Sequence, residues 1–280
     1  MILVTGATGN VGRQIVEQLV SAGAPVRAVS RRPEQTAWPD GVEAVAGDLT
    51  AGLSAEVFRD VTAMHLFPVP DRVAGVVAGA EAAGVRHVTV LSSLAADSDE
   101  HGPLSRRHLD VEQAVAASTM TWTFVRPGMF MTNTRQWAPL IRAEGVVRQP
   151  YPDSVTAPIH EDDIAAVTVA ALLDPGRHAG RAYELSGPDP LSQVDRMAVI
   201  SRAIGRELRF DELTREQART DLLRSPWMSE GLADALLSLM AATVGARDGL
   251  VLPAVEDVTG RSPRTFASWV EQHRQEFVGA

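Results

Sequence analysis

The chain has 280 residues, and 45% of them are hydrophobic, which suits one large domain or a core domain with a smaller lobe. Its formal net charge is −9, and every basic residue apart from histidine is an arginine, because the sequence contains no lysine. An acidic chain lacks the broad positive potential that attracts nucleic acid or an anionic membrane surface. The sequence also has no cysteine, which excludes disulfides and thiolate metal sites.

The N-terminus gives no sign of a targeting segment. The first residues form a short apolar run that is typical of a buried strand, with no charged region before it. No apolar run approaches the ~20 residues that cross a bilayer. We therefore expect a cytoplasmic protein, monomeric or homodimeric, that binds neither nucleic acid nor membranes.

Apolar runs alternate with helical patterns along the first two thirds of the chain. Strands are expected at 1–5, 26–30, 42–46, 63–69, 85–91, 121–125 and 182–185. Helices are expected at 11–22, 72–83, 104–117 and 162–173, where apolar residues recur at three- and four-residue spacing. This order favours an α/β fold, a doubly wound parallel sheet of the Rossmann type.

The pattern becomes less regular after residue 128. A stretch rich in proline and aromatic residues reads as a linker up to residue 158, and the chain beyond residue 190 is mostly helical. We predict a dinucleotide-binding domain over 1–128, to which 155–186 return. Residues 129–154 and 187–280 are expected to form a small, mostly helical substrate-binding lobe.

A glycine-rich loop joins the first predicted strand to the first helix. Gly6 permits a tight turn, Gly9 lets the backbone approach a pyrophosphate, and Gly12 lets the helix pack closely on the sheet. The free amides at the start of the helix then face the anion. The loop residues predicted to bind the cofactor are Gly6, Thr8, Gly9, Asn10, Val11 and Gly12. The alternative is a glycine-rich turn without a ligand.

The end of the second strand indicates which dinucleotide binds. An acidic residue there would favour NAD through the ribose hydroxyl, but this chain has Arg31 and Arg32. Two guanidinium groups suit a 2′-phosphate, so NADP(H) is the expected cofactor, although a solvated surface pair is the alternative. Asp48 and Leu49 follow the third strand. Asp48 is placed to meet the adenine edge or a backbone amide, or to cap a helix.

These motifs, with Leu91-Ser92-Ser93 and Arg126-Pro127-Gly128, resemble the NmrA-like group of atypical short-chain dehydrogenases/reductases. The group includes NADPH-dependent quinone reductases and redox-sensing regulators. The resemblance implies a Rossmann domain, a small C-terminal lobe and a substrate cleft between them. The chain departs from the superfamily because it lacks the Tyr-x-x-x-Lys dyad; its tyrosines are Tyr151 and Tyr183.

The predicted third long helix carries His108 and Glu112 where that dyad is expected. Their spacing places both side chains on one helical face, and the pair resembles His-x-x-x-Glu or His-x-x-x-Lys in parts of the NmrA-like group. His108 is the candidate proton donor, and Glu112 would orient the imidazole or favour its charged form. The alternative is an ordinary helical pair, with His108 bound only to the cofactor. Ser92, Ser93 and Pro127 are expected at the nicotinamide end of the site, with strand-end capping as the alternative for the serines.

Apolar and aromatic residues follow several strand ends and favour a flat acceptor such as a quinone. The expected substrate contacts are Phe67, Met129, Phe130, Trp137 and Trp227, and Phe67, Pro68 and Val69 are also expected beside the cofactor. Packing between the two parts of the chain explains each of them equally well. No metal is expected, because the acidic run after His160 reads as a helix cap. The first hypothesis is an NADPH-dependent quinone-type oxidoreductase; the alternatives are a non-catalytic NADP(H) sensor and a biosynthetic tailoring reductase.

Overall fold

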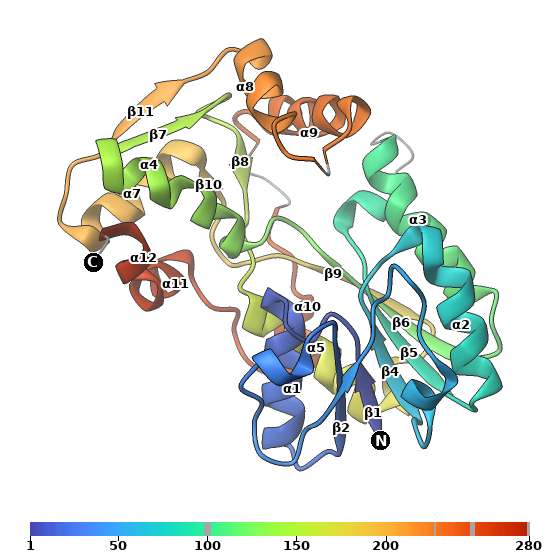
Figure 1. Ribbon diagram of the computed structural model, residues 1–280. Coiled ribbons are helices and arrows are strands. Elements are labelled where there is room, and N and C mark those ends of the chain that lie inside the picture. The colour runs from blue at the N-terminus through green and yellow to red at the C-terminus, as the bar shows by residue number, and fades with distance from the viewer. Residues whose placement is uncertain (98–101, 227, 247–249, 279–280) are drawn as a thin grey trace.

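The computed structural model describes residues 1–97, 102–226, 228–246 and 250–278. Its centre is a seven-stranded parallel sheet in the order β3-β2-β1-β4-β5-β6-β9 (Figure 1). The strands are β1 (Ile2–Val4), β2 (Val26–Ser30), β3 (Glu43–Ala46), β4 (Ala63–Leu66), β5 (His87–Leu91), β6 (Thr121–Pro127) and β9 (Arg181–Leu185). The predicted α/β Rossmann-type class is therefore confirmed. The order reverses beside β1, so β1 and β4 flank the position where doubly wound sheets bind dinucleotides.

Helices cover both faces of this sheet. One face carries α1 (Asn10–Ser21), α5 (Glu161–Leu173) and α10 (Ala254–Thr259), which share a core with β1 and β2. The other carries α2 (Val73–Ala82) and α3 (Pro103–Ala116), packed on β4 and β5. β1, β2, β4 and β5 are buried along their whole length, which explains why they read as largely apolar runs, whereas β3 and β9 are partly exposed. Each fully buried aliphatic side chain contributes about 1.5–3 kcal/mol.

A second core lies in the lobe beyond the carboxyl edge of the sheet. Its helical elements are η6 (Met131–Trp137), α4 (Ala138–Glu144), α7 (Gln193–Ile204), α11 (Phe266–Gln272) and α12 (Arg274–Val278). The large buried side chains of this core include Met131, Trp137, Ile141, Phe266, Trp269 and Phe277. In Figure 1 α8 (Arg215–Leu222) and α9 (Glu230–Ala242) lie at the top of the view, where α9 contacts α3.

The prediction of an irregular linker up to residue 158 is wrong. That segment holds η6, α4, β7 (Val146–Gln149) and β8 (Val155–Thr156). β7 pairs in parallel with β11 (Arg209–Glu212), and β8 pairs with β10 (Leu191–Ser192). These strands are short and their partners are distant in sequence, so no local pattern indicated them.

The chain leaves the sheet after β6 and later returns to it. α5 packs along α1, and β9 adds the last strand beside β6. The short helix α6 (Pro175–His178) joins them. None of the helices among the described residues is long and apolar enough to span a membrane.

Candidate functional site

The glycine loop lies at the carboxyl end of β1. Gly6 has a φ of +63°, in the left-handed region that favours glycine. A Cβ on Gly12 would overlap the carbonyl oxygen of Gly6, so the helix can approach the loop only because Gly12 has no side chain. The amide of Gly9 donates to the Gly6 carbonyl at 2.9 Å and closes the turn. The tasks predicted for Gly6 and Gly12 match this geometry.

The first turn of α1 is open to an anion. Gly9 is the N-cap residue, and among the described residues no side chain caps the helix or places an acid in its first turn. Thr8 and Asn10 are exposed, whereas Val11 is buried beneath the loop. Free amides and the positive end of the helix dipole make this a suitable place for a pyrophosphate. Binding of the cofactor at these residues stays a prediction.

Arg31 and Arg32 follow β2 and are both exposed. Within the part of the chain that the structure describes, neither forms an ion pair with a carboxylate. Free guanidinium groups beside the glycine loop fit a phosphate well, because they present several donors at little desolvation cost. The residues present are therefore compatible with the 2′-phosphate of NADP(H).

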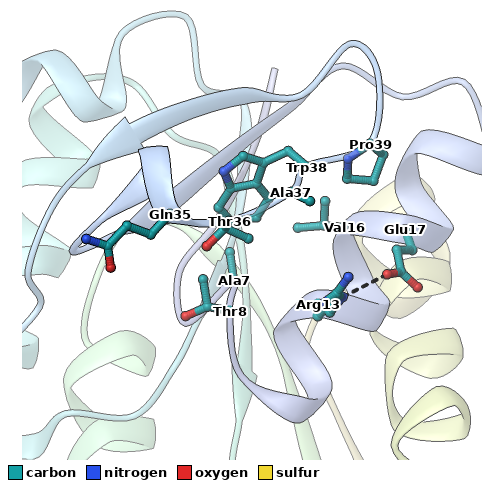
Figure 2. A pocket seen from close by; sticks show the side chains of 10 residues that line it. All are labelled: Ala7, Thr8, Arg13, Val16, Glu17, Gln35, Thr36, Ala37, Trp38 and Pro39. Carbon is teal, nitrogen blue, oxygen red and sulfur yellow. Dashed lines mark hydrogen bonds and ion pairs between the residues drawn. The ribbon is translucent and has the colours of Figure 1, made fainter.

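A pocket of about 220 Å³ lies between the glycine loop and the segment just beyond Arg32 (Figure 2). α1 contributes Arg13 and Glu17, which form an ion pair at 3.0 Å. The opposite wall is the stretch 35–39, which Trp38 anchors by donating from its indole nitrogen to the Pro33 carbonyl. Arg13 is a third guanidinium at this end of the site, and the sequence analysis did not single it out.

Asp48 closes a local turn after β3. Its Oδ1 accepts hydrogen bonds from the Thr50 amide at 2.9 Å and the Thr50 hydroxyl at 2.7 Å. These two bonds lower the pKa of Asp48, and the charge of Arg31 acts in the same direction. The expectation of a contact with a nearby amide is thus met within the protein itself. Leu49 beside it is partly buried against the sheet core.

The loop after β4 lies directly over Gly6. Phe67 is 43% exposed, and a Cβ placed on Gly6 would lie 2.9 Å from the Phe67 Cβ. Thr5 fixes this arrangement, because its hydroxyl donates to the His65 carbonyl and accepts from the Phe67 amide. Pro68 and Val69 follow at the same edge and are partly buried. An exposed aromatic ring beside the glycine loop is available to a ligand.

Glu112 is engaged by residues that were not predicted to bind it. Its Oε1 accepts from Arg126 Nε at 3.0 Å and from the Ser92 hydroxyl at 2.5 Å, and its Oε2 accepts from Arg126 Nη2 at 2.7 Å. The carboxylate is buried, with Arg126 also lying 3.9 Å from Glu184. The carboxylate oxygens of Glu112 are thus taken up by Arg126 and Ser92 and not by His108, so among the described residues Glu112 does not orient the imidazole by a hydrogen bond. Although burial has the larger effect on the pKa of His108, the charge of Glu112 still acts to raise it, in line with the other alternative, that Glu112 favours the charged imidazole.

His108 is half-buried on α3, and its Nδ1 has no hydrogen-bond partner among the described residues. Burial and the charge of Arg107 lower its pKa, while the charge of Glu112 acts in the opposite direction. The imidazole is consequently neutral near pH 7. A neutral imidazole can donate and accept hydrogen bonds, but little of it is in the acidic form that a proton donor requires.

The two serines after β5 have different tasks. The Ser92 hydroxyl is buried and donates to Glu112, so its proton is already used within the protein; a contact with the cofactor stays a prediction. The Ser93 oxygen accepts from the Ala95 amide at 3.2 Å and caps the turn η4 (Leu94–Asp97), as the capping alternative proposed. Pro127 is buried at the end of β6. This strand pairs with β5, which the two serines follow.

The substrate candidates divide between a partly open and a closed group. Met129 and Phe130 are partly buried just beyond β6, and Phe130 packs against the core on the α1 face of the sheet. Trp137 is 3% exposed and belongs to the lobe core, which supports the packing alternative for its ring. Trp227 lies outside the described residues.

Three arginines in this region were not among the residues predicted to bind the cofactor or substrate. Arg126 binds Glu112, Arg135 reaches Asn10 in the glycine loop at 3.4 Å, and Arg196 is buried on α7. A signal existed for two of them: Arg126 ends an apolar strand, and Arg196 shares a helical face with Ile200 and Ile204. A charged residue on an otherwise buried face requires a specific partner.

The acidic run after His160 behaves as predicted. His160 is the N-cap of α5, and its Nδ1 accepts from the Asp162 amide at 3.1 Å. The described residues include no group of three or more side chains arranged to hold a metal ion. Asp163 instead binds the backbone and side chain of Arg264.

Comparisons with known proteins agree with the fold. The profile of the NmrA-like family matches residues 1–244. The chain is 43% identical to (4-alkanoyl-5-oxo-2,5-dihydrofuran-3-yl)methyl phosphate reductase of Streptomyces griseus, with 99% of each chain covered. It is 36% identical to NAD(P)H azoreductase of Xenophilus azovorans, over 100% of each chain.

Among solved structures, the NADPH complex of an NADPH-dependent quinone oxidoreductase from Escherichia coli superposes with a TM-score of 0.79. It is 25% identical, and the match covers 98% of this chain and 99% of that one. The family profile spans most of the sequence, and the relatives match it from end to end. The chain therefore belongs to the NmrA-like family.

Proposed function

We propose that this protein is an NADPH-dependent reductase that transfers hydride to a conjugated acceptor, either a quinone or an unsaturated lactone. The observation that carries the proposal is the open glycine loop next to two unpaired arginines, Arg31 and Arg32. Membership of a family whose relatives include NAD(P)H reductases supports it.

The cofactor would lie along the carboxyl edge of the sheet. Its pyrophosphate would meet the amides of Gly9, Asn10 and Val11, and its 2′-phosphate would meet Arg31 and Arg32. The loop 67–69 and the ends of β5 and β6 would line the nicotinamide side. NADPH supplies the hydride, and the protein supplies position and electrostatics.

The proton that accompanies hydride transfer has two sources in this proposal. His108 lies on the helix that faces this edge, but its lowered pKa keeps it neutral near pH 7. Solvent is therefore the favoured source, with His108 as a hydrogen-bonding group that positions the cofactor or the acceptor. A quinone or an enone accepts a proton from water after reduction, so the missing tyrosine does not prevent this chemistry.

The proposed acceptor class is supported by the side chains at the carboxyl edge of the sheet and by the relatives. Phe67, Met129 and Phe130 offer an aromatic and thioether surface to a flat molecule. The Streptomyces griseus relative is named for an unsaturated lactone that bears a phosphate, and the Escherichia coli structure for a quinone. A lactone intermediate of a biosynthetic route is thus as good a candidate as a quinone.

The decisive test measures NADPH consumption by absorbance with a panel of quinones, azo dyes and unsaturated lactones. We expect turnover with at least one conjugated acceptor and a preference for NADPH over NADH. If the protein binds NADPH but reduces none of them, the reductase proposal is wrong and a non-catalytic sensor is favoured. Partner capture that differs between NADP+ and NADPH would then support the sensor.

The role of His108 is tested by His108→Gln, because glutamine keeps a hydrogen-bonding group but cannot carry a titrating proton. We expect kcat to change by less than about threefold with no loss of a pH-dependent step, as positioning requires. A fall of about a hundredfold, with cofactor affinity unchanged, would make His108 the proton donor.

A further inference from the structure

The lobe contains a buried cation that the fold does not neutralise. Arg196 lies on α7 and is 3% exposed. Burial lowers its pKa to about 10, so the guanidinium is still charged near pH 7. Within the residues that the structure describes, no carboxylate forms an ion pair with it.

The polar contacts of Arg196 are weak. Its Nε donates to the Ser192 carbonyl at 3.4 Å, and its Nη1 donates to the Met129 sulfur at 3.0 Å. The guanidinium also lies over the Trp137 ring, with its carbon 5.2 Å from the ring centroid. A thioether is a poor acceptor, so the five donors of the guanidinium are mostly unused.

Trp137 adds a second unpartnered donor at the same place. Its indole Nε1 is buried and has no acceptor among the described residues, although buried indole nitrogens are usually hydrogen-bonded. The guanidinium and this indole come from different elements, α7 and η6, yet they lie against one another. A buried guanidinium whose acceptors among the described residues are only a long carbonyl contact and a thioether, next to an indole nitrogen that has no acceptor there, favours a stronger acceptor that arrives from outside.

Stability does not explain this arrangement. Burying a charge without a partner costs several kcal/mol, and an apolar side chain of similar size would fill the space more favourably. The cation–π contact with Trp137 offsets only part of that cost. A bound oxyanion would supply the missing countercharge.

Met129 connects this cluster with the proposed site. It follows β6 by two residues, at the sheet edge where the glycine loop lies, and it is partly exposed, whereas Arg196 and Trp137 are buried. Its sulfur accepts from Thr156 as well as from Arg196. Because a methionine side chain is unbranched and flexible, it can move aside when a stronger acceptor enters.

We propose that Arg196, with the Trp137 indole and the Thr156 hydroxyl, forms a subsite for an oxyanion substituent of the acceptor, a phosphate ester or a carboxylate, which displaces the Met129 thioether. That the bound oxyanion belongs to the hydride acceptor rests on the proposed function; that an oxyanion binds at this subsite does not. The acceptor would thus be an anionic conjugated molecule, oriented by its charged group toward the lobe and by its reducible double bond toward the sheet edge.

The test is calorimetric titration of the NADP+-saturated protein with benzyl phosphate, phenylacetate and benzyl alcohol. We expect at least one anion to bind and the alcohol not to bind; the stronger anion identifies the charged group. Arg196→Met should weaken anion binding by at least about tenfold, the loss expected when a charge-assisted bond is removed. Arg202→Met, the same change at an exposed position of α7, should bind like the unmodified protein.

A second variant protects the test against misfolding. Trp137→Phe keeps the ring under the guanidinium but removes the indole donor, and we expect a loss of about threefold or more in anion affinity. Thermal unfolding of all variants verifies that each is folded. Unchanged anion binding in both Arg196→Met and Trp137→Phe would overturn the proposal.

Other outcomes are equally informative. Anion binding that occurs only without cofactor, and that NADP+ abolishes, places the anion at Arg31 and Arg32 and overturns the subsite. Anion binding that depends on Arg196 in a protein that reduces no acceptor keeps the subsite and rejects the reductase. Turnover that is equally fast for phosphorylated and dephosphorylated acceptors keeps the reductase proposal and rejects the anion subsite.

Discussion

Arg126 donates hydrogen bonds to both carboxylate oxygens of Glu112, from its Nε to Oε1 at 3.0 Å and from its Nη2 to Oε2 at 2.7 Å. Their side chains are only 14% and 5% exposed, and Ser92 completes the set from the neighbouring strand. The pair therefore fastens α3 to the carboxyl edge of β5 and β6. Its position beside the proposed nicotinamide site makes Glu112 a group that shapes the site rather than one that reacts.

Breaking this pair from the arginine side should be costly. Arg126→Met would leave the Glu112 carboxylate buried without its countercharge, and we expect the free energy of unfolding to fall by about 3 kcal/mol. Adding Glu112→Gln should recover part of that loss, because the neutral amide still accepts from Ser92. Urea denaturation of the two single variants and the double variant measures the coupling. A double variant no more stable than Arg126→Met would show that the charge is not the cause.

The identity of the cofactor is tested at the end of β2. Arg31→Ala removes a guanidinium that would contact only the 2′-phosphate, so we expect NADPH binding to weaken by about 1–3 kcal/mol and NADH binding to stay nearly unchanged. Arg86→Ala, at an exposed position beside the opposite end of β5, serves as the control. Fluorescence titration gives both affinities. Equal losses for the two dinucleotides would refute the 2′-phosphate assignment.

The glycine loop can be tested with two alanine substitutions. In Gly12→Ala the new Cβ would overlap the Gly6 carbonyl, so we expect the loop to be displaced and NADPH affinity to be lost. Gly75→Ala in α2 meets nothing within 4 Å and should stabilise the protein by about 0.5–1 kcal/mol. Cofactor titration and thermal unfolding of both variants make the comparison. If Gly12→Ala binds NADPH as tightly as the unmodified protein, a side chain at position 12 does not displace the loop.

Acid should destabilise the sheet through His65. This histidine is fully buried in β4, its Nδ1 lies 3.0 Å from the Thr89 hydroxyl, and burial lowers its pKa from 6.5 to about 3. As the pH falls below about 6.5, His65 takes up a proton in the unfolded chain but stays neutral in the folded chain. The free energy of unfolding therefore decreases from about pH 6.5 down to about pH 3. From pH 7 to pH 5 the loss should be about 2 kcal/mol.

His65→Gln isolates that contribution, because glutamine does not titrate. We expect the variant to lose less stability than the unmodified protein over the same pH interval, by about the same 2 kcal/mol. Urea denaturation at both pH values gives the difference. Parallel pH profiles for the two proteins would mean that other groups, such as His87, cause the acid sensitivity.

The sheet was predictable because its signals are local. Most of its strands are short, largely apolar runs that end at a glycine, a proline or a polar turn, and the run Val26–Ser30 coincides with the observed strand. The cap at His160 and the turn at Gly6 were also readable, since each depends on residues close together in sequence.

The pairings across the fold were not predictable in the same way. Glu112 and Arg126 come from different elements, so helical spacing directed attention to His108 instead. β7 and β11 are far apart in the sequence, with α5, β9 and α7 between them, and neither carries a clear alternating pattern. Arg196 could have been noticed as a charge on an apolar helical face, but that no carboxylate among the described residues pairs with it is visible only when the lobe is assembled.

The return of α5 and β9 to the sheet has a practical consequence for protein engineering. Ile164, Ala165 and Leu185 complete the same core as Val4 and Ile15, so a fragment that stops after β6 would expose that face of the sheet. We therefore expect residues 1–127 alone not to fold as an autonomous module. Exchanging the lobe between relatives would require grafting three separate stretches of chain at once, because α10 returns to the sheet between α9 and α11.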